Sequence, residues 1–193
     1  MWIIRDGRAF VASTLRKYTD RTTFKACRSW ARGMRKKRKI IRAPPRGKSM
    51  RVQYEAFVDD TPAHLETMCE FLGMNYESSM LDYLNRELHI LGGNPGPLTP
   101  YVDLHGLKYL YFAREGGTHE VMDFTASTYK HVKGKVMELD HYRKTDPKKF
   151  KDERWKEELT DGQLRLFALT AGRVNRKYGY PASLDRQSSI VST

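Results

Sequence analysis

The sequence predicts a mainly α protein, in which a small helical domain, an αα-hairpin plus three further helices, follows a long basic N-terminal extension. After residue 60, apolar residues recur at helical spacing between cap residues and glycine stops. Before residue 52, the chain holds 17 Lys and Arg but only two acids, whereas the remainder carries a net charge of −3. We therefore divide the chain into the basic extension (1–51), the helical domain (52–181) and a polar C-terminal tail (182–193).

The basic extension has two parts. Residues 2–17 fit a short amphipathic helix with the Arg-rich, Ser/Thr-containing and acid-poor composition of a mitochondrial targeting segment, although an ordinary basic helix is the alternative. Residues 28–51 form the densest basic stretch, with five consecutive cations from Arg35 to Lys39. Like charges at i and i+4 destabilise an isolated helix, and the Pro-Pro pair that follows stops one. We expect this segment to lack a core of its own and to become ordered only on a partner.

Local signals place the first helices of the domain. Residues 52–58 alternate loosely and predict a short strand or an extended lead-in. Thr61 is a good N-cap before a proline, and Gly73 is a helix stop. A second helix is expected from about residue 75 to residue 91, where a Gly-Gly pair ends it. Two short helices with a tight glycine connection predict an αα-hairpin.

The second half of the domain is expected to be helical as well. Residues 106–113 are apolar and aromatic and fit either a buried strand or a helical turn. A long helix is predicted from Thr118 to about Lys144, although Gly134 weakens the pattern. Further helices are predicted to start at Asp146, which precedes a proline, and at Thr160, an N-cap.

The sequence shows no catalytic, metal-binding or cofactor-binding signature. None of the six histidines is paired at metal-binding spacing, and the two cysteines form no C-x-x-C pair, which favours reduced thiols. The glycine-rich segments are not followed by Gly-Lys-Ser/Thr, and no G-x-S-x-G occurs. No stretch approaches 18 apolar residues, so no membrane span is expected. We expect a protein that is not an enzyme and that needs no metal, cofactor or small-molecule substrate.

The basic extension carries the candidate binding site. Lys and Arg neutralise phosphates, arginine also stacks on bases, and the aromatic residues among the cations can stack on unpaired bases. A second basic patch near the C-terminal end offers further phosphate contacts, or simply opposes a helix dipole. The predicted RNA-binding residues are Arg28, Trp30, Arg32, Arg35, Lys36, Lys37, Arg38, Lys39, Arg42, Arg46, Lys48, Arg51, Arg173, Arg176 and Lys177.

In its Arg-rich start, its RKKRKIIRAPPRGK arm and its small helical body without an active site, the chain resembles the lineage-specific proteins of mitochondrial ribosomes. The resemblance covers mainly residues 1–51. It implies a non-catalytic structural subunit in the mitochondrial matrix, whose arm contacts rRNA and whose acidic body contacts neighbouring protein subunits. The alternative is an accessory subunit of a mitochondrial inner-membrane respiratory or ATP synthase complex, the only case with membrane contact. A small RNA-processing enzyme is a third class.

Overall fold

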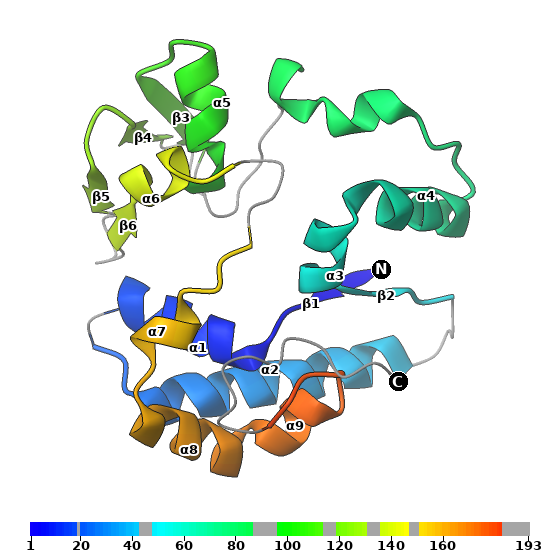
Figure 1. Ribbon diagram of the computed structural model, residues 1–193, viewed down its shortest axis with the longest axis vertical. Coiled ribbons are helices and arrows are strands. Elements are labelled where there is room, and N and C mark those ends of the chain that lie inside the picture. The colour runs from blue at the N-terminus through cyan, green and yellow to red at the C-terminus, as the bar shows by residue number, and fades with distance from the viewer. Residues whose placement is uncertain are drawn as a thin grey trace. The chain divides into compact units, whose positions relative to one another are not determined.

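A computed structural model describes residues 1–18, 20–42, 48–86, 96–113, 119–130, 136–146 and 151–182 (Figure 1). The described part is mainly α, which confirms the predicted fold class. Its strands form three two-stranded sheets. The chain divides into two compact units, one made of residues 1–60 and 151–193 and the other of residues 61–150.

The first unit combines the two ends of the chain around one hydrophobic core. The parallel strands β1 and β2 pair with Trp2 opposite Arg51, and helices α8 and α9 pack along α2 (Figure 1). Its elements are β1 (Trp2–Ile4), α1 (Gly7–Lys17), α2 (Thr23–Arg42), β2 (Arg51–Gln53), α3 (Tyr54–Asp59), α7 (Trp155–Glu158), α8 (Asp161–Thr170) and α9 (Gly172–Arg176).

The segment predicted as one helix over residues 2–17 is a strand followed by a helix. Trp2–Ile4 is rich in aromatic and β-branched residues, which favour a strand. Asp6 then caps α1, because its side chain accepts a hydrogen bond from the backbone N–H of Arg8. The helix therefore begins only at Gly7.

The prediction that residues 28–51 have no core of their own is wrong as far as residue 42; residues 43–47 lie outside the described part. This stretch belongs to the 20-residue helix α2, whose apolar face joins the main core. Trp30 packs against Phe167 of α8, with ring centroids 5.9 Å apart. Burying such side chains stabilises by roughly 1.5–3 kcal/mol each, whereas a like-charge pair costs only about 0.2–0.5 kcal/mol. Core burial therefore outweighs the repulsion among the cations.

The capped helices of both units agree with the sequence. Thr160 and Gln163 form a reciprocal capping box at the start of α8, which ends at Thr170 and is continued by α9 after Ala171. In the second unit, α4 (Thr61–Leu72) begins and ends where predicted, and Gly73 adopts the left-handed conformation of a helix stop at φ 71°.

The second helix of the predicted αα-hairpin is absent from residues 78–86. Two short 3₁₀ helices, η1 (Ser78–Leu81) and η2 (Tyr83–Asn85), take its place, and residues 87–95 lie outside the described part. Local hydrogen bonds between side chains accompany these turns, since the Ser79 hydroxyl donates to the Glu77 carboxylate and the Asn85 amide to the Asp82 carboxylate.

The predicted long helix from Thr118 to Lys144 is also wrong within the described residues. Its place is taken by strands and one short helix, and the strand alternative for residues 106–113 is the one observed. The β-branched residues Thr128 and Val136 favour strands, and each strand of this region pairs with an antiparallel partner. The elements of this region are η3 (Gly96–Leu98), α5 (Thr99–Leu104), β3 (Tyr109–Ala113), β4 (His119–Asp123), β5 (Thr128–Lys130), β6 (Val136–Glu138) and α6 (Leu139–Arg143).

The second unit has a small core of its own. Four buried residues form it: Val102, Met122, Phe124 and Leu139. In neither unit does a described helix have both the length and the apolar character required to cross a membrane.

Candidate functional site

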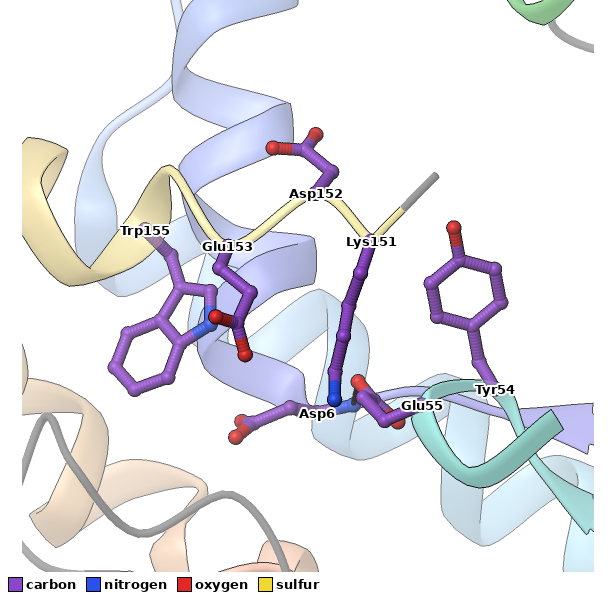
Figure 2. A pocket seen from close by; sticks show the side chains of 7 residues that line it. All are labelled: Asp6, Tyr54, Glu55, Lys151, Asp152, Glu153 and Trp155. Atoms are coloured by element: carbon purple, nitrogen blue, oxygen red, sulfur yellow. Dashed lines mark hydrogen bonds between the residues drawn. The ribbon is translucent and has the colours of Figure 1, made fainter. Parts of the chain in front are cut away.

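A small pocket of the first unit lies where β1 leads into α1 (Figure 2). Three segments meet there: the turn before α1, the start of α3 and the chain that leads into α7. Carboxylates dominate its lining, which consists of Asp6, Tyr54, Glu55, Lys151, Asp152, Glu153 and Trp155. The pocket therefore has mixed charge. Some of its charged groups pair with one another and hold the fold together, and these form the framework of the pocket.

Arg8 and Asp6 form a buried ion pair that belongs to the framework. The guanidinium of Arg8 is fully buried and lies 2.6 Å from Asp6 Oδ2 through Nη2, and its Nε donates to both carboxylate oxygens. It also lies 4.0 Å from the ring centroid of Trp155. Asp6 accepts a further hydrogen bond from Asn175 Nδ2 at 3.2 Å. Because its charge is already compensated, Arg8 is not available to an outside ligand.

Glu55 and Tyr180 complete this framework. Glu55 Oε1 accepts a hydrogen bond of 3.1 Å from the backbone N–H of Asp6, and Oε2 accepts one from the Tyr180 hydroxyl. That hydroxyl also lies 3.1 Å from the carbonyl oxygen of Ile4. Burial, together with the charge of Glu55, raises the pKa of Tyr180, so the phenol stays protonated and acts as a donor.

Arg5 differs from Arg8 because part of its binding capacity is unused. Its Nη2 donates to the carbonyl oxygen of Asp152 at 2.6 Å, and its guanidinium lies 5.0 Å from the ring centroid of Tyr54. Its Nε is buried but has no hydrogen-bond partner among the described residues. The side chain is 29% exposed. A buried N–H without an acceptor is costly, so an anion that reached Arg5 would find an unsatisfied donor.

Three arginines surround Asp152. Arg154 Nε lies 2.8 Å from its carboxylate, and Arg5 and Arg16 each approach it to 3.8 Å. Burial alone would raise the pKa of Asp152, but the hydrogen bond from Arg154 and the charges of all three arginines lower it to about 2. Glu158 supplies a second carboxylate, 2.6 Å from Arg16 Nη2. Arg16 is therefore shared between Asp152 and Glu158.

The structure separates the sequence-predicted RNA-binding residues into three groups. Trp30 is only 6% exposed and belongs to the core, so the prediction that it stacks on bases is wrong. Arg46 lies outside the described residues. The others lie at the surface, half-buried for Arg38 and exposed for Arg28, Arg32, Arg35, Lys36, Lys37, Lys39, Arg42, Lys48, Arg51, Arg173, Arg176 and Lys177.

The structure brings the basic ends of α2 and α9 together. Partial desolvation, with the nearby charges of Arg38, Arg42 and Arg173, lowers the pKa of Lys177. The two basic segments that the sequence suggested separately therefore share one surface, distinct from the residues that line the pocket.

Sequence reasoning did not find Arg5, Asp6, Glu55 or Asp152. One local signal in the sequence marks Arg5 and Asp6. They directly follow the apolar residues 2–4 and precede Gly7, the residue at which α1 begins. No comparable signal marks Asp152, because its partner Arg5 is 147 residues away along the chain.

Residues 1–78 match the model of the Sulfotransferase family. The match covers less than half of the chain and includes β1, α1, α2, β2, α3 and α4. No curated protein and no solved structure matches the chain.

The family match corrects the functional expectations. The resemblance to mitochondrial ribosomal proteins is wrong, because the residues on which it depended, 1–51, lie inside the sulfotransferase-like segment. The predictions of a non-catalytic ribosomal subunit, of an RNA-binding role and of an rRNA partner are therefore wrong as well. The alternative, a subunit of a respiratory or ATP synthase complex, gains no support. The expectations of no enzyme activity and no small-molecule substrate are likewise overturned. The mitochondrial location stays a prediction.

Proposed function

We propose that this chain takes part in the transfer of a sulfate group from an activated donor to a small-molecule acceptor. The match of residues 1–78 to the Sulfotransferase family carries this proposal. The matched segment contains the turn between β1 and α1, where the side chain of Arg5 is 29% exposed and its buried Nε has no hydrogen-bond partner among the described residues. Among the steps of sulfate transfer, binding of the anionic donor is therefore the one for which the described residues supply a side chain, that of Arg5.

Side chains, rather than the amino end of α1, are suited to bind that donor. The first amides of α1 already have acceptors, because Gly7 N donates to Asn175 Oδ1 at 3.0 Å and Arg8 N donates to Asp6 Oδ1 at 2.9 Å. Arg8 itself is neutralised by Asp6. Arg5 remains, with a planar guanidinium that matches the oxygens of sulfate or phosphate.

Sulfate transfer also needs a change of bonds and a proton acceptor. The acceptor oxygen attacks sulfur, the sulfur–oxygen bond to the donor breaks, the electron pair leaves with the donor, and the acceptor proton passes to a base. The pocket carboxylates are poorly suited to be that base. Asp6 and Glu55 are hydrogen-bonded in the framework, Asp152 is a weak base with its low pKa, and Glu153 lies 2.9 Å from Lys156 Nζ. We therefore assign donor binding to Arg5 and assign no base.

The proposal is tested by assaying the full chain with an activated donor that carries radioactive sulfate and with a panel of phenols, alcohols and amines. We expect transfer to at least one acceptor class. Arg5→Ala should weaken donor binding at least tenfold in calorimetry, because a charge-assisted contact contributes about 1.5–3 kcal/mol. Arg5→Lys should recover part of the affinity.

The control variant removes an exposed arginine that lies outside residues 1–78. Arg165 is exposed on α8, so Arg165→Ala should leave donor affinity and transfer unchanged. Circular dichroism confirms that each variant is folded. A wild-type chain that neither binds the donor nor transfers sulfate contradicts the proposed function, and equal loss in both alanine variants contradicts the role of Arg5.

A further inference from the structure

One line of cations runs along α2 and faces away from the core. Its members alternate at intervals of three and four residues, and all of them are exposed. This cationic seam consists of Lys25, Arg28, Arg32, Arg35, Lys39 and Arg42. Residues at such intervals lie along one side of a helix and follow its axis closely.

The opposite face of α2 fixes the seam in place. Cys27 is fully buried, and Trp30 and Met34 are nearly so, in the core that they share with residues of α8 and α9. The ribbon of α2 runs alongside these two helices (Figure 1). Core packing therefore anchors α2 from Ala26 to Met34, whereas residues 35–42 contribute no buried side chain. The cations up to Arg35 lie on or directly beside this anchored part, and the helix continues the row to Lys39 and Arg42.

Positive charge on this surface is not balanced within the described part of the chain. Helix α2 contains no acidic residue, and no ion pair involving a seam residue occurs among the described residues. Helix α9 contacts α2, and its Arg173, together with Lys177 directly after the helix, lies near Arg42 at the carboxyl-terminal end of the seam. An anionic partner would relieve this repulsion.

The spacing of the seam distinguishes between anionic partners. An average of 3.5 residues at a rise of about 1.5 Å places successive cations about 5 Å apart along the axis. A second helix with carboxylates at the same three-and-four spacing repeats at the same distance. On an extended strand, residues on one face repeat at about 7 Å, and phosphates of one nucleic-acid strand advance by about 3.4 Å along the duplex axis. Of these three repeats, that of the helix equals the spacing of the seam.

We propose that the cationic seam of α2 is a docking surface for an acidic helix of a partner protein, which carries Asp or Glu at alternating intervals of three and four residues. Each carboxylate then lies opposite a Lys or Arg, and the arginines form paired hydrogen bonds with it. This surface does not include Arg5, so the inference stands independently of the proposed sulfate transfer.

The test uses the full chain and two synthetic helical peptides of identical composition. One peptide carries six glutamates at the three-and-four spacing, and the other distributes them around the helix. Fluorescence anisotropy at low salt should show at least tenfold tighter binding of the first peptide. The difference should shrink as salt is raised, since exposed charges are screened.

Charge-matched variants locate the contact. Arg28→Glu combined with Arg35→Glu reverses two seam charges, whereas Lys37→Glu combined with Arg165→Glu makes the same charge change at exposed positions away from the seam. We expect at least a tenfold loss of peptide affinity in the first double variant and less than a threefold loss in the second. All four sites are exposed, so both variants should fold, as circular dichroism would show.

Three results would overturn the inference. Equal affinity for the two peptides would show that charge arrangement is irrelevant. Equal loss in the two double variants would reduce the effect to net charge. Tighter binding of a single-stranded RNA homopolymer or of anionic lipid vesicles than of the first peptide, lost in the seam variant, would assign the surface to another class of partner.

Discussion

At the scale of single residues, Asp152 is the group whose ionisation the structure controls most clearly. It lies among Arg5, Arg16 and Arg154, and their combined effect lowers its pKa to about 2. Its charge therefore contributes to stability across the neutral and mildly acidic range. A carboxylate whose folded-state pKa is lowered stabilises fully above its unfolded value, near 3.8, and loses that contribution as the pH falls through about 2.

We predict that Asp152→Asn lowers the free energy of unfolding at pH 7 by about 1–2 kcal/mol, less than the full pKa shift implies because water screens the partly exposed arginines. Chemical denaturation at pH 7, 4 and 2 measures the difference. The difference in the free energy of unfolding between wild type and variant should decrease steadily from pH 4 to pH 2. A gap that stays constant over this window would show that the carboxylate charge is not the source of the stability.

Sequence reasoning finds such residues only where the partners are close along the chain. The Arg8–Asp6 pair spans only two residues, but its burial could not be inferred from the sequence, so residues 2–17 were predicted as one helix and the turn at Asp6 was missed. Trp30 was assigned to RNA because cations surround it in sequence. In the structure they lie on other faces of α2, and the indole packs inward on Phe167.

At the scale of elements, the packing of α1 against α2 and α8 depends on a glycine. A Cβ on Gly7 would lie 2.8 Å from Phe167 and 2.9 Å from Trp30, which is too close for a carbon contact. The start of α1 therefore approaches its neighbours only because this residue has no side chain. Gly33 of α2 offers the contrast, because its Cβ would meet nothing within 4 Å.

We predict that Gly7→Ala lowers the free energy of unfolding by about 1–3 kcal/mol through overpacking. Gly33→Ala should instead raise it by up to about 1 kcal/mol, since alanine is the better helix former. Thermal denaturation of the two single variants measures the direction of each change in the free energy of unfolding. Destabilisation of similar size at both positions would refute the close approach at Gly7.

The elements also show what local signals can predict. Helices α4 and α8 were predicted because their caps and stops are encoded within a few residues. The extent of α2 was missed, because its stability comes from contacts with α8 that span more than 100 residues. Strands β4 to β6 were missed because an apolar pattern at helical spacing was preferred over the β-branched composition of residues 119–138, and strand pairing is invisible in a single segment.

At the scale of the whole molecule, each compact unit has its own core. The first contains Leu164 and Phe167 with residues from both chain ends, whereas the second is built around Val102, Phe124 and Leu139. Leu164 and Leu139 are buried to the same degree, so truncating either creates a comparable cavity in a different unit.

We predict that Leu164→Ala and Leu139→Ala each destabilise one unit by about 2–5 kcal/mol. Hydrogen exchange should accelerate in α2 and α8 for Leu164→Ala, and in β4 and α6 for Leu139→Ala. Mass spectrometry of peptic fragments resolves the two patterns. Uniform acceleration across the chain in either variant would mean that the units unfold as one.

The contact between Tyr180 and Ile4, 176 residues apart, also has a consequence for synthesis. Translation proceeds from the amino terminus at roughly 5–20 residues per second, so Ile4 is synthesised about 9–35 s before Tyr180. During that delay Asp6 and Arg8 lack Asn175 and Trp155, and the apolar face of α2 lacks α8. The first unit therefore completes its fold only after Tyr180 has been synthesised, and until then its nascent amino-terminal segment exposes apolar surface of the kind that chaperones bind.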